Sequence, residues 1–187
     1  MKKIVSFVVL SLATLFIGCG AAKLAPETQA LLENKTTLYT QVGMWTENNK
    51  IIGTNYSTGI HIPVNSEVTI VGANAKIITF MYDGQKINYE VMSKYTRVDT
   101  SAMIARLFSE KKVSLSGLSP ATKTNILNGA VAMGMTKQSV LLSRGYPPFH
   151  ATRGIEANKW KYWRNRFLTA YVTFKNGKVV KIDGAIS

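Results

Sequence analysis

The sequence is poor in the residue types that most often carry chemistry. Its 187 residues include one cysteine, two histidines and 10 acidic residues. A single cysteine excludes a disulfide within the chain. With two histidines and no close cluster of His, Asp and Glu, no ligand set reaches the number that a zinc site requires. We therefore expect no metal ion and no cofactor.

The chain also lacks the patterns of a catalytic centre. His61 and His150 fall in different predicted domains, and there is no Gly-x-Ser-x-Gly segment around a serine nucleophile. Gly-x-Gly-x-x-Gly and Walker-type loops, which cradle phosphates, are missing as well. His150 follows Pro147-Pro148 and is interpreted as a loop residue without catalytic partners. We predict that the protein is not an enzyme.

The shortage of acidic residues leaves a strongly basic chain. Lys and Arg number 23 against 10 Asp and Glu, a net charge of +13. Such a charge attracts anionic partners, which include nucleic acid, phospholipid, lipopolysaccharide phosphate and cell-wall polymers. Composition is otherwise ordinary for a globular protein, with 46% hydrophobic and 18% charged residues.

The N-terminus has the pattern of an export signal. Lys2 and Lys3 precede an apolar run, Ile4 to Ile17, that is too short to span a membrane comfortably, and the small residues Gly18 and Gly20 follow. We interpret residues 1–18 as a signal peptide. Because an exported protein leaves the compartment that holds nucleic acid, we expect no nucleic-acid partner.

The segment from Leu15 to Cys19 resembles the bacterial lipobox, although Phe16 stands where leucine is usual. The resemblance implies cleavage before Cys19, lipidation of its sulfur and further acylation, for example with palmitate. By similarity to enterobacterial sorting rules, Gly20 implies the outer membrane, with the protein facing the periplasm. Loss of Lys2 and Lys3 leaves 21 basic and 10 acidic residues, or +11. The alternatives are an uncleaved anchor and an ordinary signal peptide with an incidental cysteine.

Residues 19–36 are interpreted as a tether and residues 37–110 as a β-rich domain that ends in a helix. Thr, Val, Ile and Tyr dominate the second range, with turn residues between short runs. A two-residue hairpin loop at Asp83-Gly84 places apolar residues on one face. The helix is capped by Asp99 or Thr100 and carries an apolar stripe that reaches Phe108. The expected strands are Thr37–Val42, Ile51–Thr54, Glu67–Val71, Lys76–Tyr82 and Gln85–Val91. By analogy they suggest a small antiparallel barrel or rolled sheet of the SH3-like kind, and we predict the barrel.

After a connector at Glu110–Ser116, residues 119–187 are predicted to form two helices and three strands. Ser119-Pro120 begins the first helix, which ends at Gly129. Thr136 caps the second helix, which ends at Gly145. The strands are Lys159–Arg164, Leu168–Lys175 and Lys178–Ile182.

The turn between the last two strands allows two registers. A two-residue Asn176-Gly177 loop places Lys181 opposite Val172 and mixes the faces of the strand. A three-residue loop with a bulge at Gly177 pairs Val172 with Val180. We therefore predict the three-residue loop.

Several motifs of the C-terminal part, in order and spacing, resemble the SmpA/OmlA family, also called BamE-like. They are Gly134-Met135-Thr136-Lys137-Gln138-Ser139-Val140, Gly145-Tyr146-Pro147, Trp160-Lys161-Tyr162, Val172-Thr173-Phe174 and Gly177-Lys178-Val179. The resemblance covers about residues 119–183 and implies an α+β domain of two helices on a three-stranded antiparallel sheet. Family members are outer-membrane lipoproteins, among them a non-enzymatic accessory subunit of the β-barrel assembly machine.

The stretch from Lys159 to Phe167 alternates cations with aromatic residues. In a strand, Lys159, Lys161 and Trp163 share one face, and Trp160, Tyr162 and Arg164 share the other. The functional interpretation is a platform for anionic lipid or glycan. The structural interpretation is an amphipathic strand with a buried face formed by Trp160 and Tyr162 and with solvated lysines. The candidate binding residues are Lys159, Trp160, Lys161, Tyr162, Trp163, Arg164 and Arg166.

We expect a lipid-anchored docking module for an envelope protein partner, in outer-membrane protein assembly or envelope integrity. The alternative is a lipoprotein that binds peptidoglycan or anionic phospholipid and links wall to membrane. A third hypothesis is an enzyme inhibitor, because similar two-helix domains occur in β-lactamase inhibitor proteins.

Overall fold

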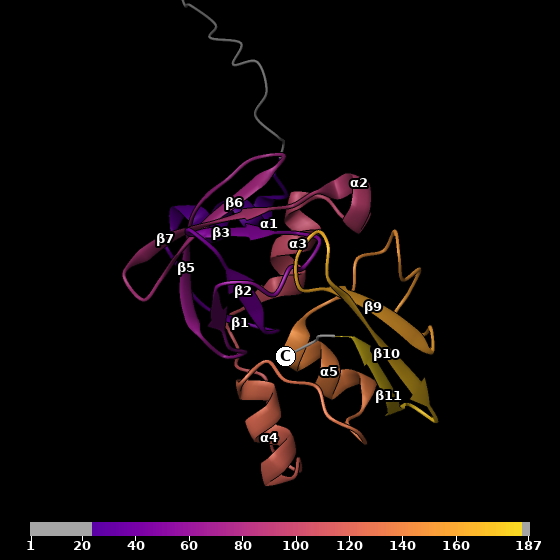
Figure 1. The fold of residues 1–187 in the computed structure, drawn as a ribbon. Helices are drawn as coiled ribbons and strands as arrows, with labels where there is room; N and C mark the ends of the chain where they lie inside the picture. The colour runs from indigo at the N-terminus through magenta and orange to yellow at the C-terminus, as the bar shows by residue number, and fades with distance from the viewer. Residues whose placement is uncertain (1–23, 185–187) are drawn as a thin grey trace, which may run out of the picture.

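The structure is a computed structural model that describes residues 24–184. These residues form a mixed α+β protein with five helices and three sheets (Figure 1). The predicted signal peptide, Cys19 and the start of the predicted tether lie outside the described residues. The helices are α1 Pro26–Glu33, α2 Ser93–Thr96, α3 Thr100–Leu107, α4 Pro120–Leu127 and α5 Lys137–Arg144.

The strands of the N-terminal half form two separate sheets. A six-stranded sheet has the order β3-β7-β6-β5-β1-β8, and β2 pairs with β4 alone. The bounds of these strands are β1 Thr37–Thr40, β2 Met44–Thr46, β3 Lys50–Ile52, β4 Ile60–Ile62, β5 Glu67–Ala73, β6 Ile77–Tyr82, β7 Gln85–Glu90 and β8 Phe108–Ser109.

The predicted antiparallel barrel is wrong. In the described part of the chain β3 and β8 are the two edge strands, and no pairing joins them. Strand β3 lies parallel to β7, with Ile51 opposite Tyr89, so the sheet is not purely antiparallel. Phe108, expected on the helix, has extended backbone and starts β8, which pairs with Thr40 of β1. The six strands therefore make an open sheet.

The hairpin prediction at Asp83-Gly84 is confirmed. Tyr82 pairs with Gln85 and Phe80 with Ile87, as a two-residue loop requires. Asp83 and Gly84 have φ angles of 46° and 71°, which match the type I′ turn that suits the twist of paired strands. Phe80 and Ile87 both lie in the first apolar core, because the period of two directs them to the same face.

The first apolar core lies between the six-stranded sheet and helix α3. Asp99 caps α3 by accepting a hydrogen bond from the Ala102 amide at 2.8 Å. Helix α1 also packs here through Leu31 and Leu32. Residues 26–33, which the prediction placed in the tether, therefore form a helix that packs on the first core.

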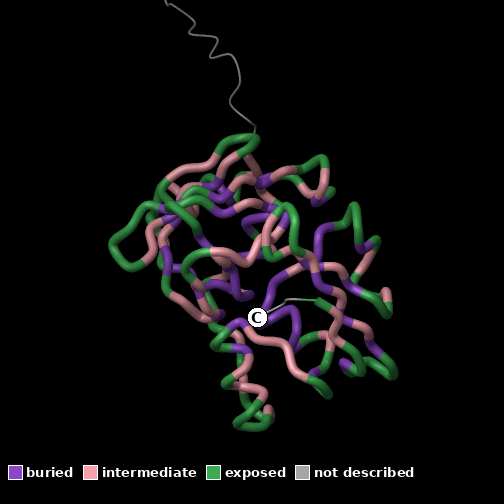
Figure 2. The backbone as a smooth tube through the Cα atoms, viewed as in Figure 1, coloured by how far each residue is buried: buried purple, intermediate pink, exposed green. Residues whose placement is uncertain are grey.

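The second apolar core lies between helices α4 and α5 and a three-stranded antiparallel sheet. Ser119 and Thr136 cap the two helices with their hydroxyls, as expected. The sheet order is β11-β10-β9, with β9 Lys159–Trp163, β10 Thr169–Lys175 and β11 Lys178–Gly184. Figure 2 colours the backbone by burial, and buried residues lie along α5 and the three strands. The prediction of two helices on three strands is confirmed.

The predicted three-residue loop between β10 and β11 is wrong. Lys175 pairs with Lys178, which leaves a two-residue Asn176-Gly177 turn. The register then shifts by one residue beside Thr173 and Phe174, so Val172 pairs with Ile182. Val180 is the extra residue of this bulge and is 43% exposed. The bulge restores the apolar face that a regular two-residue hairpin would have lost.

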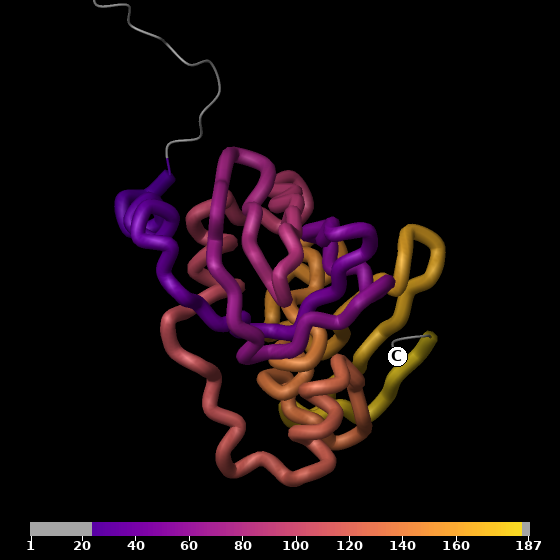
Figure 3. Tube along the Cα trace, turned by 90° about the vertical axis from the view of Figure 1, so that its left-hand side faces the viewer, coloured from indigo at the N-terminus to yellow at the C-terminus, as the bar shows by residue number. Residues whose placement is uncertain are grey.

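The two cores meet along a direct junction. The Gly43 amide donates a hydrogen bond of 2.8 Å to the Leu142 carbonyl of α5. A side chain at Gly43 would collide with the Ser143 carbonyl oxygen, so glycine is what permits this approach. Val64, from the N-terminal half, packs in the second core. The connector after β8 runs along the outside of the molecule to α4 (Figure 3).

Candidate functional site

Strand β9 divides the predicted binding residues into two groups. Trp160 and Tyr162 point inward and are 0% and 1% exposed. The Trp160 ring packs against Phe174 at 4.6 Å between centroids, and the Tyr162 hydroxyl donates to the Gly145 carbonyl at 2.9 Å. Burial raises the pKa of Tyr162, whereas the nearby Arg144 lowers it. Trp160 and Tyr162 are therefore core residues, and the prediction that they belong to a binding surface is wrong.

Lys159, Lys161 and Trp163 lie on the outer face of β9, as predicted. Tyr171 of β10 sits opposite Lys161 in the register and joins them. The Lys159 ammonium lies 4.4 Å from the centre of the Tyr171 ring, and the Lys161 ammonium lies 4.8 Å from that of Trp163. Each such cation–aromatic contact at an exposed site is worth about 0.5–1 kcal/mol. The contacts orient the lysines without neutralising them.

The outer face continues onto the N-terminal half of the molecule. The His150 ring lies 5.2 Å from Trp163 and 5.1 Å from Tyr95 of α2. The His150 amide donates to the Tyr95 carbonyl at 3.3 Å, which holds the loop after α5 against α2. We call this surface the aromatic–cation band; its residues are Tyr95, His150, Lys159, Lys161, Trp163 and Tyr171.

The loop that joins β9 to β10 forms an apolar tip beside the band. Phe167 is 76% exposed and Leu168 is 49% exposed. The Asn165 side chain accepts hydrogen bonds from both of their amides at 2.9 Å, which defines the shape of the tip. Arg164 and Arg166 are also exposed, and the Arg166 guanidinium lies 4.5 Å from the centre of the Phe167 ring. The tip therefore combines exposed apolar area with two cations.

The cations of the band and the tip have no carboxylate partner within residues 24–184. Ion pairs in this part of the chain join Lys50 to Glu90 and Lys181 to Asp183. Four positive side chains of β9 and the loop after it thus have no carboxylate partner among residues 24–184: Lys159, Lys161, Arg164 and Arg166. Such a set of cations complements an anionic partner.

A buried arginine joins the two cores behind the band. Arg144, at the end of α5, is 2% exposed and stacks at 4.4 Å on the ring of Trp45. Its guanidinium donates to the Ser57 hydroxyl at 2.7 Å and to the Gly129 carbonyl at 3.3 Å. Burial lowers the pKa of Arg144 to about 10. Arg144 therefore acts as a cross-link between α5 and the N-terminal half.

His61 lies beside this arginine and is held neutral. Its ring packs on Trp45 at 4.4 Å between centroids. The pKa of His61 is lowered to about 4, mainly because the ring is buried and secondly because the Arg144 cation repels a proton there. His61 thus belongs to the structural junction, whereas His150, in a loop as expected, belongs to the surface band.

The junction should make folding stability dependent on pH. Because the pKa of His61 falls from 6.5 in the unfolded chain to about 4 in the fold, only the unfolded chain takes up this proton between those values. The free energy of unfolding should fall by about 2 kcal/mol as the pH drops from 6.5 to 4, allowing for partial solvent access. Urea titrations across this range measure the effect. His61→Phe keeps a ring on Trp45 and should flatten the His61 contribution; an unchanged pH profile would contradict the assignment.

Sequence reasoning missed several members of this surface for different reasons. The sequence did contain a signal for Tyr171: Ala170 and Val172 face the core, so strand alternation directs Tyr171 outward. Tyr95 and His150 carry no such signal, since they come from separate elements brought together by tertiary packing. Arg144 had the pattern of an ordinary cation at a helix C-terminus.

Two further kinds of feature concern residues 24–184, metal-ligand clusters and membrane-spanning helices. No three or more His, Cys, Asp or Glu side chains are grouped in a way that could hold a metal ion there. In the same range, no helix has the length and apolar character needed to cross a membrane. Comparisons of the chain with models of protein families, with curated proteins and with solved structures found no match in any of the three.

Proposed function

We propose that the protein is a non-enzymatic, lipid-anchored envelope protein that docks an acidic protein partner on the aromatic–cation band. The observation that supports this most directly is the pair of lysines held by aromatic rings, with no carboxylate beside them among residues 24–184. Aromatic residues and cations on one sheet face give both apolar contact and charge complementarity. Trp160 and Tyr162 anchor the inner face of this sheet in the second core.

The proposed setting is the periplasmic face of the outer membrane, with residue 19 carrying the lipid. The lipobox-like residues and the basic start of the chain support this setting. The motifs between residues 134 and 179 support a BamE-like domain and hence a role in outer-membrane protein assembly or envelope integrity. Mass spectrometry of the native protein should find the chain starting at Cys19 with diacylglycerol on its sulfur. An intact leader or a free thiol would exclude this anchoring.

The docking proposal is tested by photo-crosslinking in membranes. A benzophenone amino acid in place of Tyr171 should crosslink to a discrete acidic envelope protein. The double variant Lys159→Glu, Lys161→Glu should reduce that crosslink about 10-fold, because each reversed charge repels the partner. The matched control is Lys76→Glu, Lys86→Glu, which makes the same charge change at exposed positions in β7 and in the turn before β6. Equal crosslinking in both double variants would contradict the proposal.

A second candidate function has its own supporting observation, the exposed tip at Phe167 and Leu168. Exposed apolar side chains flanked by arginines suit insertion at an anionic lipid surface. If this function holds, Phe167→Ser with Leu168→Ser should abolish sedimentation with phosphatidylglycerol vesicles, whereas the band variants retain the tip. A Tyr171 crosslink to lipid alone, with no protein, would favour this second function over the first.

A further inference from the structure

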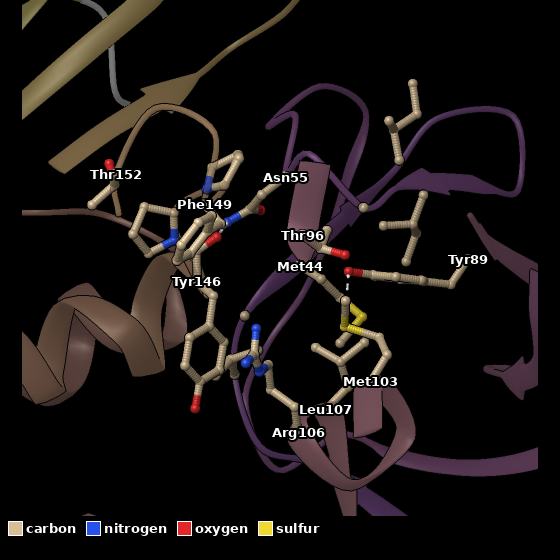
Figure 4. A pocket seen from close by; sticks show the side chains of 18 of the residues that line it. Met44, Asn55, Tyr89, Thr96, Met103, Arg106, Leu107, Tyr146, Phe149 and Thr152 are labelled. Carbon is tan, nitrogen blue, oxygen red and sulfur yellow. Dashed lines mark hydrogen bonds between the residues drawn. The ribbon is translucent and has the colours of Figure 1, made fainter. Parts of the chain in front are cut away.

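A cavity of about 230 Å³ lies between the two cores, away from the outer face of β9 and β10. One wall comes from the first core and the other from the loop that follows α5 (Figure 4). Phe149 and Ile155, both partly exposed, line it from the loop side. The side chains that matter most for its chemistry are those of Met44, Tyr89, Met103, Arg106, Leu107 and Tyr146.

The two walls of the cavity are joined by hydrogen bonds that do not involve its contents. The Asn55 side-chain amide donates to the Tyr146 carbonyl at 3.0 Å, and the Gly43 amide donates to the Leu142 carbonyl at 2.8 Å. These contacts fix the position of the loop after α5 relative to the first core. The cavity is therefore preformed, as small-molecule sites usually are.

Two polar groups matter for a ligand in this mostly apolar space, because the other polar side chains of the lining, those of Asn55, Thr96 and Thr152, hydrogen-bond to the backbone. The Tyr89 side chain is almost fully buried, and its hydroxyl has one partner among the described residues, the Met103 sulfur at 3.5 Å. Sulfur is a weak acceptor, so the hydroxyl retains most of its capacity for hydrogen bonding. Burial raises the pKa of Tyr89. The hydroxyl is therefore a neutral donor and acceptor inside the cavity.

The second polar group is the Arg106 guanidinium. It lies 4.5 Å from the centre of the Tyr146 ring and has no carboxylate within ion-pair distance among residues 24–184. Figure 4 shows the guanidinium beside Tyr146, with Tyr89 reaching in from the other side. Arg106 thus places a positive charge beside an apolar space. This combination suits a ligand that has both a negative charge and an apolar body.

We propose that this cavity binds a small amphipathic carboxylate, with its aliphatic part between Met44, Met103 and Leu107 and its carboxylate on Arg106. Size supports this class of ligand. The cavity exceeds the ~150 Å³ that accommodates benzene and falls below the ~300 Å³ at which sites for drug-sized ligands begin. A medium-length fatty acid meets both limits. This site is separate from the band and does not depend on the lipid at residue 19.

The test uses octanoate as the probe and 1-octanol as its uncharged counterpart. The protein is the chain from residue 19 onward, with Cys19→Ser so that no detergent is required. Methyl-labelled methionines report the position of the ligand, because Met44 and Met103 line the cavity while Met133 is 61% exposed elsewhere. Octanoate should shift the methyl signals of Met44 and Met103 saturably and leave that of Met133 unchanged.

Charge recognition is tested with Arg106→Gln and Arg106→Glu. Both should weaken octanoate binding about 10-fold or more, since a charge-assisted hydrogen bond is lost, and should leave 1-octanol binding nearly unchanged. Lys86→Gln removes one positive charge from the exposed β7 surface and should leave octanoate binding as it was. Thermal unfolding of each variant separates lost binding from lost folding. Equal affinity for octanoate and 1-octanol, octanoate binding that survives Arg106→Glu, or shifts that spread to Met133 would each overturn the proposal.

Discussion

Replacing Trp160 with alanine should lower the free energy of unfolding by about 3–5 kcal/mol, the usual effect of truncating a fully buried large aromatic residue. The side chain is 0% exposed and fills the space between the inner face of β9 and the other elements of the second core. Its loss leaves a cavity whose walls belong to a packed sheet and two helices, so relaxation is limited. Urea unfolding of the chain with Cys19→Ser measures the change.

Two companion variants make this expectation specific. The Trp160 indole nitrogen has no hydrogen-bond partner among the described residues, so Trp160→Phe loses volume but no hydrogen bond and should be milder, below about 2 kcal/mol. Trp163→Ala, on the outer face of the same strand, should destabilise by about 1 kcal/mol or less and weaken partner docking instead. If Trp163→Ala destabilised the fold as much as Trp160→Ala, the assignment of the two faces would be incorrect.

Replacing Arg144 with alanine should destabilise the protein by about 3 kcal/mol. The change removes the stack on Trp45 and hydrogen bonds to Ser57 and Gly129, and it leaves the Gly129 carbonyl without this donor. Because these contacts join α5 to the N-terminal half, amide exchange should accelerate on both sides of the junction. Arg164→Ala, an exposed arginine, should stay within about 0.5 kcal/mol of the unsubstituted protein.

Intermediate substitutions separate charge from packing at Arg144. Arg144→Met keeps the aliphatic volume and removes a buried cation that no carboxylate balances, so its effect should be smaller, about 1–2 kcal/mol. Arg144→Lys keeps the charge but lacks the planar group that stacks on Trp45 and bonds in two directions, so it should not restore full stability. Full stability in Arg144→Lys would show that charge alone matters at this position.

The features that sequence reasoning predicted well are those set by neighbours along the chain. Ser119 and Thr136 cap their helices because a hydroxyl there reaches amides three residues away. The Asp83-Gly84 turn fixes its own register through a two-residue loop. Alternation in β9 separated the two faces of the strand, and the structural interpretation, which buried the face of Trp160 and Tyr162, is confirmed.

The errors arose at positions where pairing with residues distant in the sequence decided the local structure. A two-residue turn at Asn176-Gly177 was rejected because it mixed the faces of β11, but the bulge at Val180 corrects the faces further along the strand. Phe108 continued the helical stripe, yet pairing with Thr40 draws it into β8. The helix propensity of one residue is a weak preference, and the pairing of Phe108 with a neighbouring strand outweighs it.

By itself, the sequence of this protein determined its α+β class, its helix caps, its first hairpin and its excess of positive charge, because each depends on residues a few positions apart or on composition alone. Only the tertiary structure decided that the β-rich half is an open sheet with a parallel edge strand, that Tyr95 and His150 extend the band of β9, and that Arg106 and Tyr89 share a cavity. The physical reason is that pairing and packing between distant segments follow the lowest free energy of the whole chain, which no short window of residues contains.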